Sequence, residues 1–341
     1  MEKTFLFRCD ANADVALGHL RRCLSLAHAL SNEGAGVAFA CLDDPAARQL
    51  LGKTPYRVEW LPDCVNRGND INQTGRFLEE IQADVVVVDS YNVSVEYFNA
   101  LQKEGKDFVY FEDALTTDWP VTGIINGLIG VEKHPYQSRV RLLGPDHLVL
   151  APEYWNPAKA ENTGPELNLM VTMGGIDHYD LSSRVIRQMN NYKDGLRIHI
   201  VVGQYYENIN DIRQAADHSG HHVILHLQPQ SIASIIQMCD LAVSAGGITL
   251  YELASCRVPA IGVWLWENQR QNVERLGEAG AIKPLAYDSD ESFDGRLGAS
   301  ILELLENKES RLSMSATANR IVDGQGARRV ARKLVEMPNG N

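Results

Sequence analysis

The chain has 341 residues, 45% of them hydrophobic and 22% charged, which suffices for two α/β domains of ordinary size. The formal net charge is −12, so the basic face that nucleic-acid binding requires is missing, and a nucleic-acid partner is not expected. A small anionic ligand is still compatible with this charge, because backbone N–H groups at helix starts can hold phosphates.

The sequence also argues against membranes, secretion and bound zinc. No stretch approaches the roughly 20 uninterrupted apolar residues of a membrane span, and no secretion signal is recognisable. We therefore expect a cytoplasmic protein. The six cysteines are scattered without a CxxC pair, which favours buried free thiols over a zinc site or a disulfide framework.

Strand-like apolar stretches alternate with helical ones in the first part of the chain, which indicates a parallel sheet with helices on both faces. The predicted strands are 4–8, 37–41, 57–60, 84–88, 108–111 and 123–126. The predicted helices of this part are 20–30 and 75–82.

A segment with four prolines and two glycines, residues 144–165, shows little periodicity and is read as the crossing between two domains. The alternation then resumes, with predicted strands 167–172, 197–202, 223–227, 241–244 and 260–263. The predicted helices are 182–190, 208–217, 231–238, 250–255 and 269–279, with a helical tail from about 310. We predict an α/β protein of two Rossmann-like domains facing a cleft, 1–155 and 156–341.

Ligands of such domains bind where the carboxyl ends of strands pass into helices, and four loops at such places are unusual. The first lies within RCDANADVALGHLRR, residues 8–22. Gly18 would allow close backbone approach, and His19 at the helix start could be a general base, with Asp10 or Asn12 orienting its ring. Alternatively, the histidine only caps the helix or hydrogen-bonds a neighbouring carbonyl. The GxGxxG fingerprint is absent, which argues against a dehydrogenase.

The second loop is a Gly-Gly turn that follows the first strand of the second domain. Gly174 and Gly175 would bring backbone close to a phosphate or sugar, although a plain tight turn explains them nearly as well. Asp177 belongs to the same turn, and a minor ligand role stays open for the adjoining His178 and Tyr179.

The third loop, in SAGGITLYE, has the features of a diphosphate cradle. Gly246, Gly247 and Thr249 stand between a strand and a helix start, and the Glu252 carboxylate could receive ribose hydroxyls. In the alternative reading, Thr249 is an N-cap and Glu252 its capping-box partner.

The fourth loop follows another strand of the second domain. Its polar side chains could read a sugar or a nucleobase, or simply cap the next helix; they are Glu267, Asn268 and Gln269.

Five stretches in order along nearly the whole chain carry a family resemblance: RCDANADVALGHLRRCLSLAHAL, VTMGGID, SAGGITLYELASCRVPAIGV, ENQRQN and VDGQGARRV. Together they resemble the UDP-2,4-diacetamido-2,4,6-trideoxy-β-L-altropyranose hydrolases of pseudaminic acid biosynthesis and similar spore coat polysaccharide biosynthesis proteins. The resemblance implies a GT-B-like fold and a UDP-sugar as ligand. It also implies a role in the biosynthesis of surface polysaccharide or in flagellin glycosylation. It also implies that no metal or other cofactor is needed.

The resemblance also implies roles for individual residues. His19 would be the catalytic base or the group that positions the water, with Asp10 in the same catalytic group. Gly246, Gly247 and Thr249 would hold the diphosphate, and Glu252 and Asn268 would help to hold ribose or sugar. The remaining residues of the expected nucleotide- and sugar-binding set are Asn12, Gly18, Arg22, Gly174, Gly175, Asp177, Glu267 and Gln269.

The reaction implied is a single displacement, in which water activated by His19 attacks the anomeric carbon and UDP leaves with inversion. An inverting glycosyltransferase is the alternative, because an alcohol acceptor in place of water gives transfer instead of hydrolysis. A third reading is a protein that binds nucleotide sugars without catalysis, since fold analogy alone does not decide function.

Overall fold

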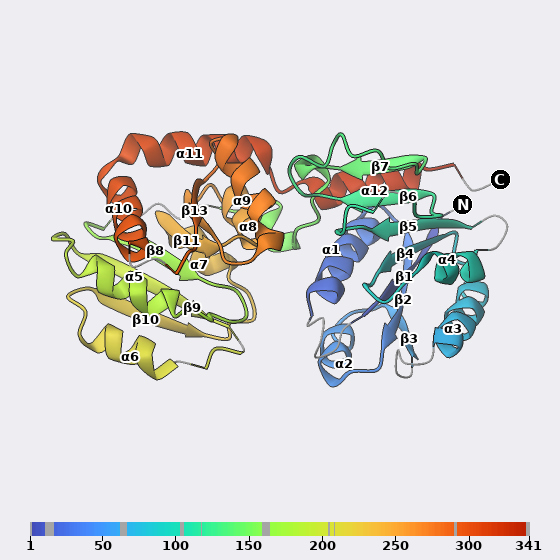
Figure 1. Cartoon of the computed structure of the whole chain (residues 1–341). Helices are drawn as coiled ribbons and strands as arrows, with labels where there is room; N and C mark the ends of the chain where they lie inside the picture. The colour runs from blue at the N-terminus through green and yellow to red at the C-terminus, as the bar shows by residue number, and fades with distance from the viewer. Residues whose placement is uncertain are drawn as a thin grey trace. The chain divides into compact units, whose positions relative to one another are not determined.

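The computed structural model describes residues 2–10, 17–61, 67–102, 106–116, 118–158, 164–203, 205–207, 209–289 and 292–338. The chain forms two compact units (Figure 1). The first consists of Met1–Pro152 together with Gly324–Asn341, and the second of Glu153–Asp323.

The first unit is built on a parallel sheet of seven strands in the order β3-β2-β1-β4-β5-β6-β7. The strands are β1 (Thr4–Cys9), β2 (Gly36–Leu42), β3 (Arg57–Leu61), β4 (Val85–Asp89), β5 (Asp107–Phe111), β6 (Gly123–Asn126) and β7 (Val140–Leu143). The helices that follow the first four are α1 (Gly18–Asn32), α2 (Pro45–Leu51), α3 (Arg67–Glu80) and α4 (Val95–Leu101). Every residue of β4 is buried, as expected for an apolar strand covered on both faces.

The second unit has a parallel sheet of six strands in the order β10-β9-β8-β11-β12-β13. The strands are β8 (Leu167–Thr172), β9 (Leu196–Val202), β10 (His222–Leu227), β11 (Leu241–Ala245), β12 (Ala260–Trp264) and β13 (Lys283–Ala286). Its helices are α5 (Leu181–Met189), α6 (Ile209–Asp217), α7 (Ala233–Met238), α8 (Thr249–Ser255), α9 (Glu267–Glu278), α10 (Phe293–Glu306) and α11 (Lys308–Ile321). The predicted fold class, two Rossmann-like domains, is confirmed.

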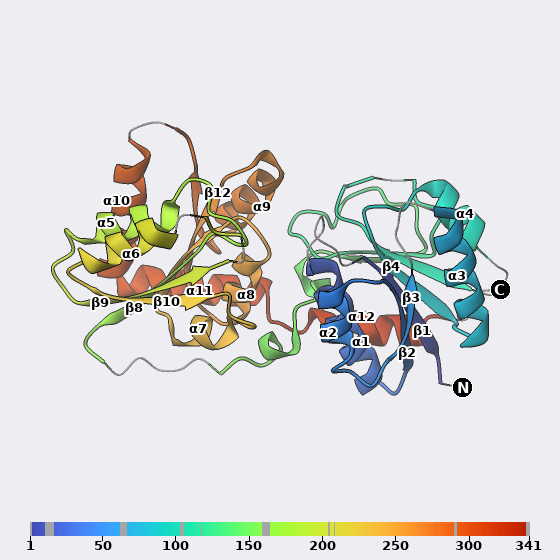
Figure 2. The same ribbon diagram turned by 90° about the horizontal axis from the view of Figure 1, so that it is seen from below.

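The C-terminal helix departs from the predicted domain division, which assigned everything after residue 155 to the second domain. Helix α12 (Gly326–Glu336) packs beside α1 in the first unit, as both views show (Figures 1 and 2). Its first residue admits no side chain, because a Cβ on Gly326 would lie 2.1 Å from the carbonyl oxygen of Leu148. An amphipathic pattern shows which face of a helix is buried but not which sheet that face covers. The sequence therefore did not indicate that α12 packs in the first unit.

Two further sequence expectations concern thiols and membranes. The free thiols of Cys9, Cys23, Cys41, Cys239 and Cys256 are buried, as predicted, whereas Cys64 lies outside the described residues. Within the described part of the chain, the helices are too short or too polar to cross a membrane.

Candidate functional site

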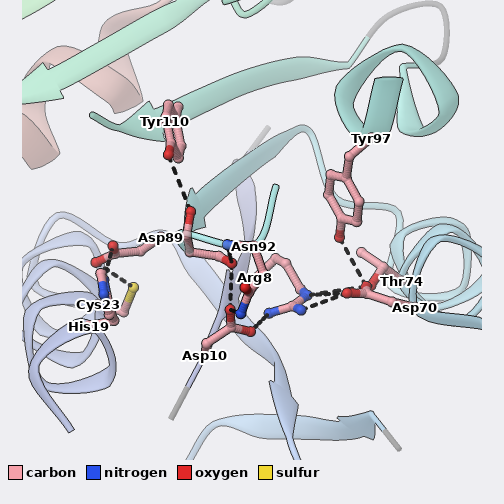
Figure 3. A network of polar contacts seen from close by, with 11 residues as sticks. Arg8, Asp10, His19, Cys23, Asp70, Thr74, Asp89, Asn92, Tyr97 and Tyr110 are labelled. Carbon is pink, nitrogen blue, oxygen red and sulfur yellow. Dashed lines mark hydrogen bonds and ion pairs between the residues drawn. The ribbon is translucent and has the colours of Figure 1, made fainter. Parts of the chain in front are cut away.

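The site in the first unit lies where β1, β4 and β5 end, because these neighbouring parallel strands end at one edge of the sheet. His19 is the second residue of α1, only 6% exposed, and its Nδ1 is hydrogen-bonded to the carboxylate of Asp89, the last residue of β4 (Figure 3). The helix begins without a side-chain cap, so His19 is not a capping residue. Because a carboxylate only accepts, Nδ1 carries the proton in the neutral ring, and Nε2 is left as a proton acceptor.

Asp89 is fully buried and accepts hydrogen bonds at both oxygens. Besides the histidine, its donors are Arg22, through Nε at 2.8 Å and a terminal nitrogen at 2.7 Å, and the thiol of Cys23 at 3.7 Å. Burial by itself would raise the pKa of Asp89, but the charge of Arg22 and the hydrogen bonds from Arg22 and His19 lower it. Asp89 is therefore an ionised carboxylate that orients the imidazole.

Asp10, predicted to assist the histidine, is part of a different network. One of its oxygens accepts from the buried guanidinium of Arg8 at 2.6 Å, and Arg8 also binds Asp70 at 2.6 Å (Figure 3). The other oxygen accepts from the hydroxyl of Ser90 and, at 3.2 Å, from the amide of Asn92. Asp10 thus stabilises the loop after β4. The residue that orients the His19 ring is Asp89, not Asp10 as expected. Asn12, the other residue proposed for that role, lies outside the described residues.

The loop after β4 brings an aromatic side chain to the histidine. Tyr91 is 62% exposed, and its ring lies edge-on to His19 with the centroids 4.5 Å apart. Beside them, Gly18 is exposed, and a Cβ there would meet no atom within 4 Å, so nothing described crowds the helix start. Neither Asp89 nor Tyr91 was predicted from the sequence, although polar residues at the end of a buried strand are a usable signal.

Arg22, expected among the ligand-binding residues, is bound by carboxylates of its own unit. In addition to Asp89 it donates to both oxygens of Asp113, at 3.1 and 2.9 Å, and its guanidinium lies over the ring of Phe111, 4.5 Å from the centroid. Arg22 therefore holds the Asp89 carboxylate in place beside His19.

In the second unit, the Gly-Gly turn follows β8. Gly174 has a φ of +80°, which favours glycine, and a Cβ on Gly174 or Gly175 would meet no atom within 4 Å. Asp177 behaves differently, because its buried carboxylate accepts the backbone N–H groups of Leu181 at 2.9 Å and Ser182 at 2.8 Å. Asp177 thus shapes the turn and the start of α5, although it was expected among the ligand-binding residues.

The two glycines after β11 have different surroundings. A Cβ on Gly246 would lie 2.6 Å from the Val273 side chain, so α9 packs directly on this backbone. A Cβ on Gly247 would meet nothing within 4 Å. Helix α8 begins with Thr249 after the N-cap Ile248, and no side chain caps it, so the capping-box reading of Thr249 and Glu252 is not observed.

Helix α9 begins at Glu267, directly after the exposed Trp266. Glu267 and Asn268 are exposed, while the Gln269 side chain accepts the backbone N–H of Leu265 at 3.0 Å. The glycine loop after β11 is tied to this helix, because Asn272, in the ENQRQN motif, donates to the carbonyl of Gly246 at 2.8 Å.

These features define the class of the fold. Two Rossmann-like units with glycine loops and polar side chains at strand carboxyl ends form a GT-B fold of the glycosyltransferase type. Residues 166–333 match the glycosyltransferase family 28 C-terminal domain. The fold is similar to that of MurG from Acinetobacter baumannii, with a TM-score of 0.73 at 15% identity over 98% of this chain and 100% of that chain.

Proteins that are similar in sequence carry more specific names than the structural neighbour. The chain is 24% identical to the spore coat polysaccharide biosynthesis protein SpsG of Bacillus subtilis, over 96% of both chains. It is 25% identical to the UDP-2,4-diacetamido-2,4,6-trideoxy-β-L-altropyranose hydrolase of Campylobacter jejuni, over 55% of this chain and 66% of that protein. An uncharacterized protein of Methanocaldococcus jannaschii is 21% identical, over 77% of this chain but only 56% of its own length. The resemblance predicted from the sequence motifs is confirmed by these names.

Proposed function

We propose that this protein is an enzyme acting on nucleotide-diphosphate sugars, and that it hydrolyses the anomeric C–O bond of a UDP-linked diacetamido-trideoxy hexose or a related sugar. The observation that carries the proposal is the His19–Asp89 pair, in which a buried carboxylate orients a histidine at a strand-to-helix loop. The name of the Campylobacter jejuni relative supports hydrolysis and this substrate class.

In the proposed mechanism, Nε2 of His19 takes a proton from water while the water oxygen attacks the anomeric carbon. The bond from that carbon to the diphosphate oxygen breaks, its electron pair leaves with UDP, and the sugar is released with inverted configuration. Asp89 stabilises the imidazolium that forms, because its negative charge is directly hydrogen-bonded to Nδ1.

The second unit would hold the nucleotide. Gly247 leaves open space at the start of α8, where the N–H groups of Ile248 and Thr249 would bind a diphosphate and stabilise its growing charge. Thr249 would add a hydroxyl donor. Glu252 and Asn268 would bind ribose or sugar hydroxyls, as the resemblance implies.

A second candidate is an inverting glycosyltransferase. The match of residues 166–333 to the C-terminal domain of a glycosyltransferase family favours it. The same base would then deprotonate an alcohol acceptor instead of water.

The test is incubation with a panel of UDP-, GDP- and CDP-sugars without acceptor, followed by mass spectrometry and by NMR of the anomeric proton. We expect free sugar of inverted configuration and UDP from one diacetamido-trideoxy substrate. Release of UDP only after an acceptor alcohol is added, with the sugar transferred to that alcohol, would establish the transferase instead.

The matched variants are His19→Ala and His28→Ala, because His28 is an exposed histidine of the same helix. Loss of a general base lowers turnover by about 10²–10⁴-fold, so we expect that loss for His19→Ala with UDP binding retained. Near-normal turnover of His19→Ala would reject His19 as the base. Equal losses in both variants would point to damage to α1 rather than to chemistry.

A further inference from the structure

We propose that Arg22 and Asp113 are positioning residues that set the protonation equilibrium of His19, Arg22 through Asp89 and Asp113 through Arg22. The inference rests on the proposed role of His19 as a base. It extends that role by naming two charged groups that bias the protonation equilibrium of the ring in opposite directions.

The contacts form one continuous chain. Asp89 Oδ1 is shared between Nδ1 of His19 and a terminal nitrogen of Arg22 at 2.7 Å, and Asp89 Oδ2 accepts Nε of Arg22 at 2.8 Å. On its other side the guanidinium donates to both oxygens of Asp113, at 3.1 and 2.9 Å. Four of the five guanidinium N–H groups are thereby used within this unit.

Burial keeps these charges effective at short range. The side chain of Asp89 is 1% exposed and those of Arg22 and Asp113 are each 25% exposed, so water screens them only in part. The ring of Phe111 covers one face of the guanidinium. The position of Arg22 is therefore held on three sides, by two carboxylates and an aromatic face.

Other titratable groups around the histidine carry little net charge. Tyr91 carries a phenol, and burial raises the pKa of the Cys23 thiol to about 11, so both are neutral near pH 7. Burial also raises the pKa of Tyr110, whose hydroxyl donates to the Ser90 carbonyl.

The remaining charged groups nearby are bound to partners of their own. Asp10 and Asp70 share the charge of Arg8. The buried carboxylate of Glu112 accepts the N–H groups of residues 114, 115 and 116 and the hydroxyl of Tyr136. Among the described residues, the charged groups in the hydrogen-bonded chain that reaches His19 are thus Asp89, Arg22 and Asp113.

The sign of each effect follows from this balance. With a neutral imidazole, the two carboxylates and one guanidinium sum to a charge of −1. Removing the guanidinium charge makes the surroundings more negative, so His19 should take up its proton at higher pH. Neutralising Asp113 makes them less negative, so His19 should take up its proton at lower pH.

The experiment compares Arg22→Gln, Asp113→Asn and Arg22→Lys by NMR titration of the His19 ring in the full chain, with the resonance assigned by its loss in His19→Gln. We expect the titration midpoint to rise by about one pH unit in Arg22→Gln and to fall by about half a unit in Asp113→Asn, because Arg22 shares the Asp89 carboxylate with His19 whereas Asp113 acts through Arg22. Arg22→Lys keeps the charge and should shift the midpoint least. Asp113→Asn retains the shape of a partly exposed side chain, so it tests the idea even if Arg22→Gln does not fold.

Opposite shifts in the two charge-removing variants support the inference, because a merely structural role gives no reason for opposite signs. Shifts of the same sign, or midpoints unchanged in both, would overturn it. The acid limb of the kcat profile should move with each midpoint. If His19→Ala keeps full turnover while the opposite NMR shifts are observed, the assignment of the base fails but the electrostatic chain stands.

Discussion

Replacement of Asp89 by asparagine is the most direct test of the histidine–carboxylate pair. The substitution keeps the size of the side chain but removes the charge that faces Nδ1 of His19. Two unit charges about 4 Å apart attract by about 4 kcal/mol at an effective dielectric constant of about 20. Arg22 is present in both proteins, so its own effect on the ring cancels in the comparison. The imidazolium formed in the reaction should therefore lose up to about 4 kcal/mol of stabilisation, which lowers kcat by about 10²–10³-fold.

The assay is steady-state hydrolysis of the substrate found in the sugar panel, with kcat and KM measured separately for Asp89→Asn, His19→Ala and the double variant. Because the two residues would act as a unit, the double variant should be no slower than His19→Ala alone. The affinity for UDP, measured by calorimetry, should be unchanged in Asp89→Asn. The reasoning is refuted if kcat of folded Asp89→Asn stays within about threefold of wild type, or if the two losses multiply in the double variant.

Two other predictions concern the second unit. Gly247→Ala should leave the melting temperature nearly unchanged, because the new methyl meets no atom within 4 Å, but should weaken UDP binding about tenfold or more in calorimetry if a diphosphate lies there. Wild-type affinity would remove this glycine from the nucleotide site. Burial, followed by the neighbouring His226, lowers the pKa of His199 to about 4, whereas the unfolded chain takes up this proton near pH 6.5. Stability should therefore be lost as pH falls from about 6.5 to 4, by up to about 3 kcal/mol in urea titrations, and His199→Gln should flatten that dependence. An equally steep loss in His199→Gln would assign the acid sensitivity to other groups.

Much of the fold was predictable from local sequence features. The central strands are short apolar runs with polar or glycine-rich residues after them, and those predicted begin and end within two residues of the observed bounds. The edge strands β7 and β13 were missed, as were α2, α4 and α10, whereas the edge strands β3 and β10 were predicted. The short sequences of β7 and β13, VRLL and KPLA, are interrupted by Arg141 and Pro284, so neither is a continuous apolar run.

The candidate site, like the fold, was predictable only where it depends on local sequence. His19 and the glycine loops were found because a histidine or a pair of glycines between a strand and a helix is visible in a few consecutive residues. The order of the strands is not visible in this way, so the sequence did not indicate that β4 lies beside β1 and brings Asp89 to a histidine 70 positions earlier. Without that contact, Asp10 appeared to be the partner of the ring, and Arg22 appeared free to bind a ligand.

The amino-acid sequence by itself thus determined the elements, the fold class and the loops that carry polar side chains, because these depend on neighbours within about one helix turn or one strand. Only the tertiary structure decided which carboxylate orients His19, which charges surround Arg22, and which unit α12 joins. These outcomes depend on contacts between residues far apart in the chain. The local sequence is compatible with several such contacts, and the order of the strands in the sheet determines which of them forms.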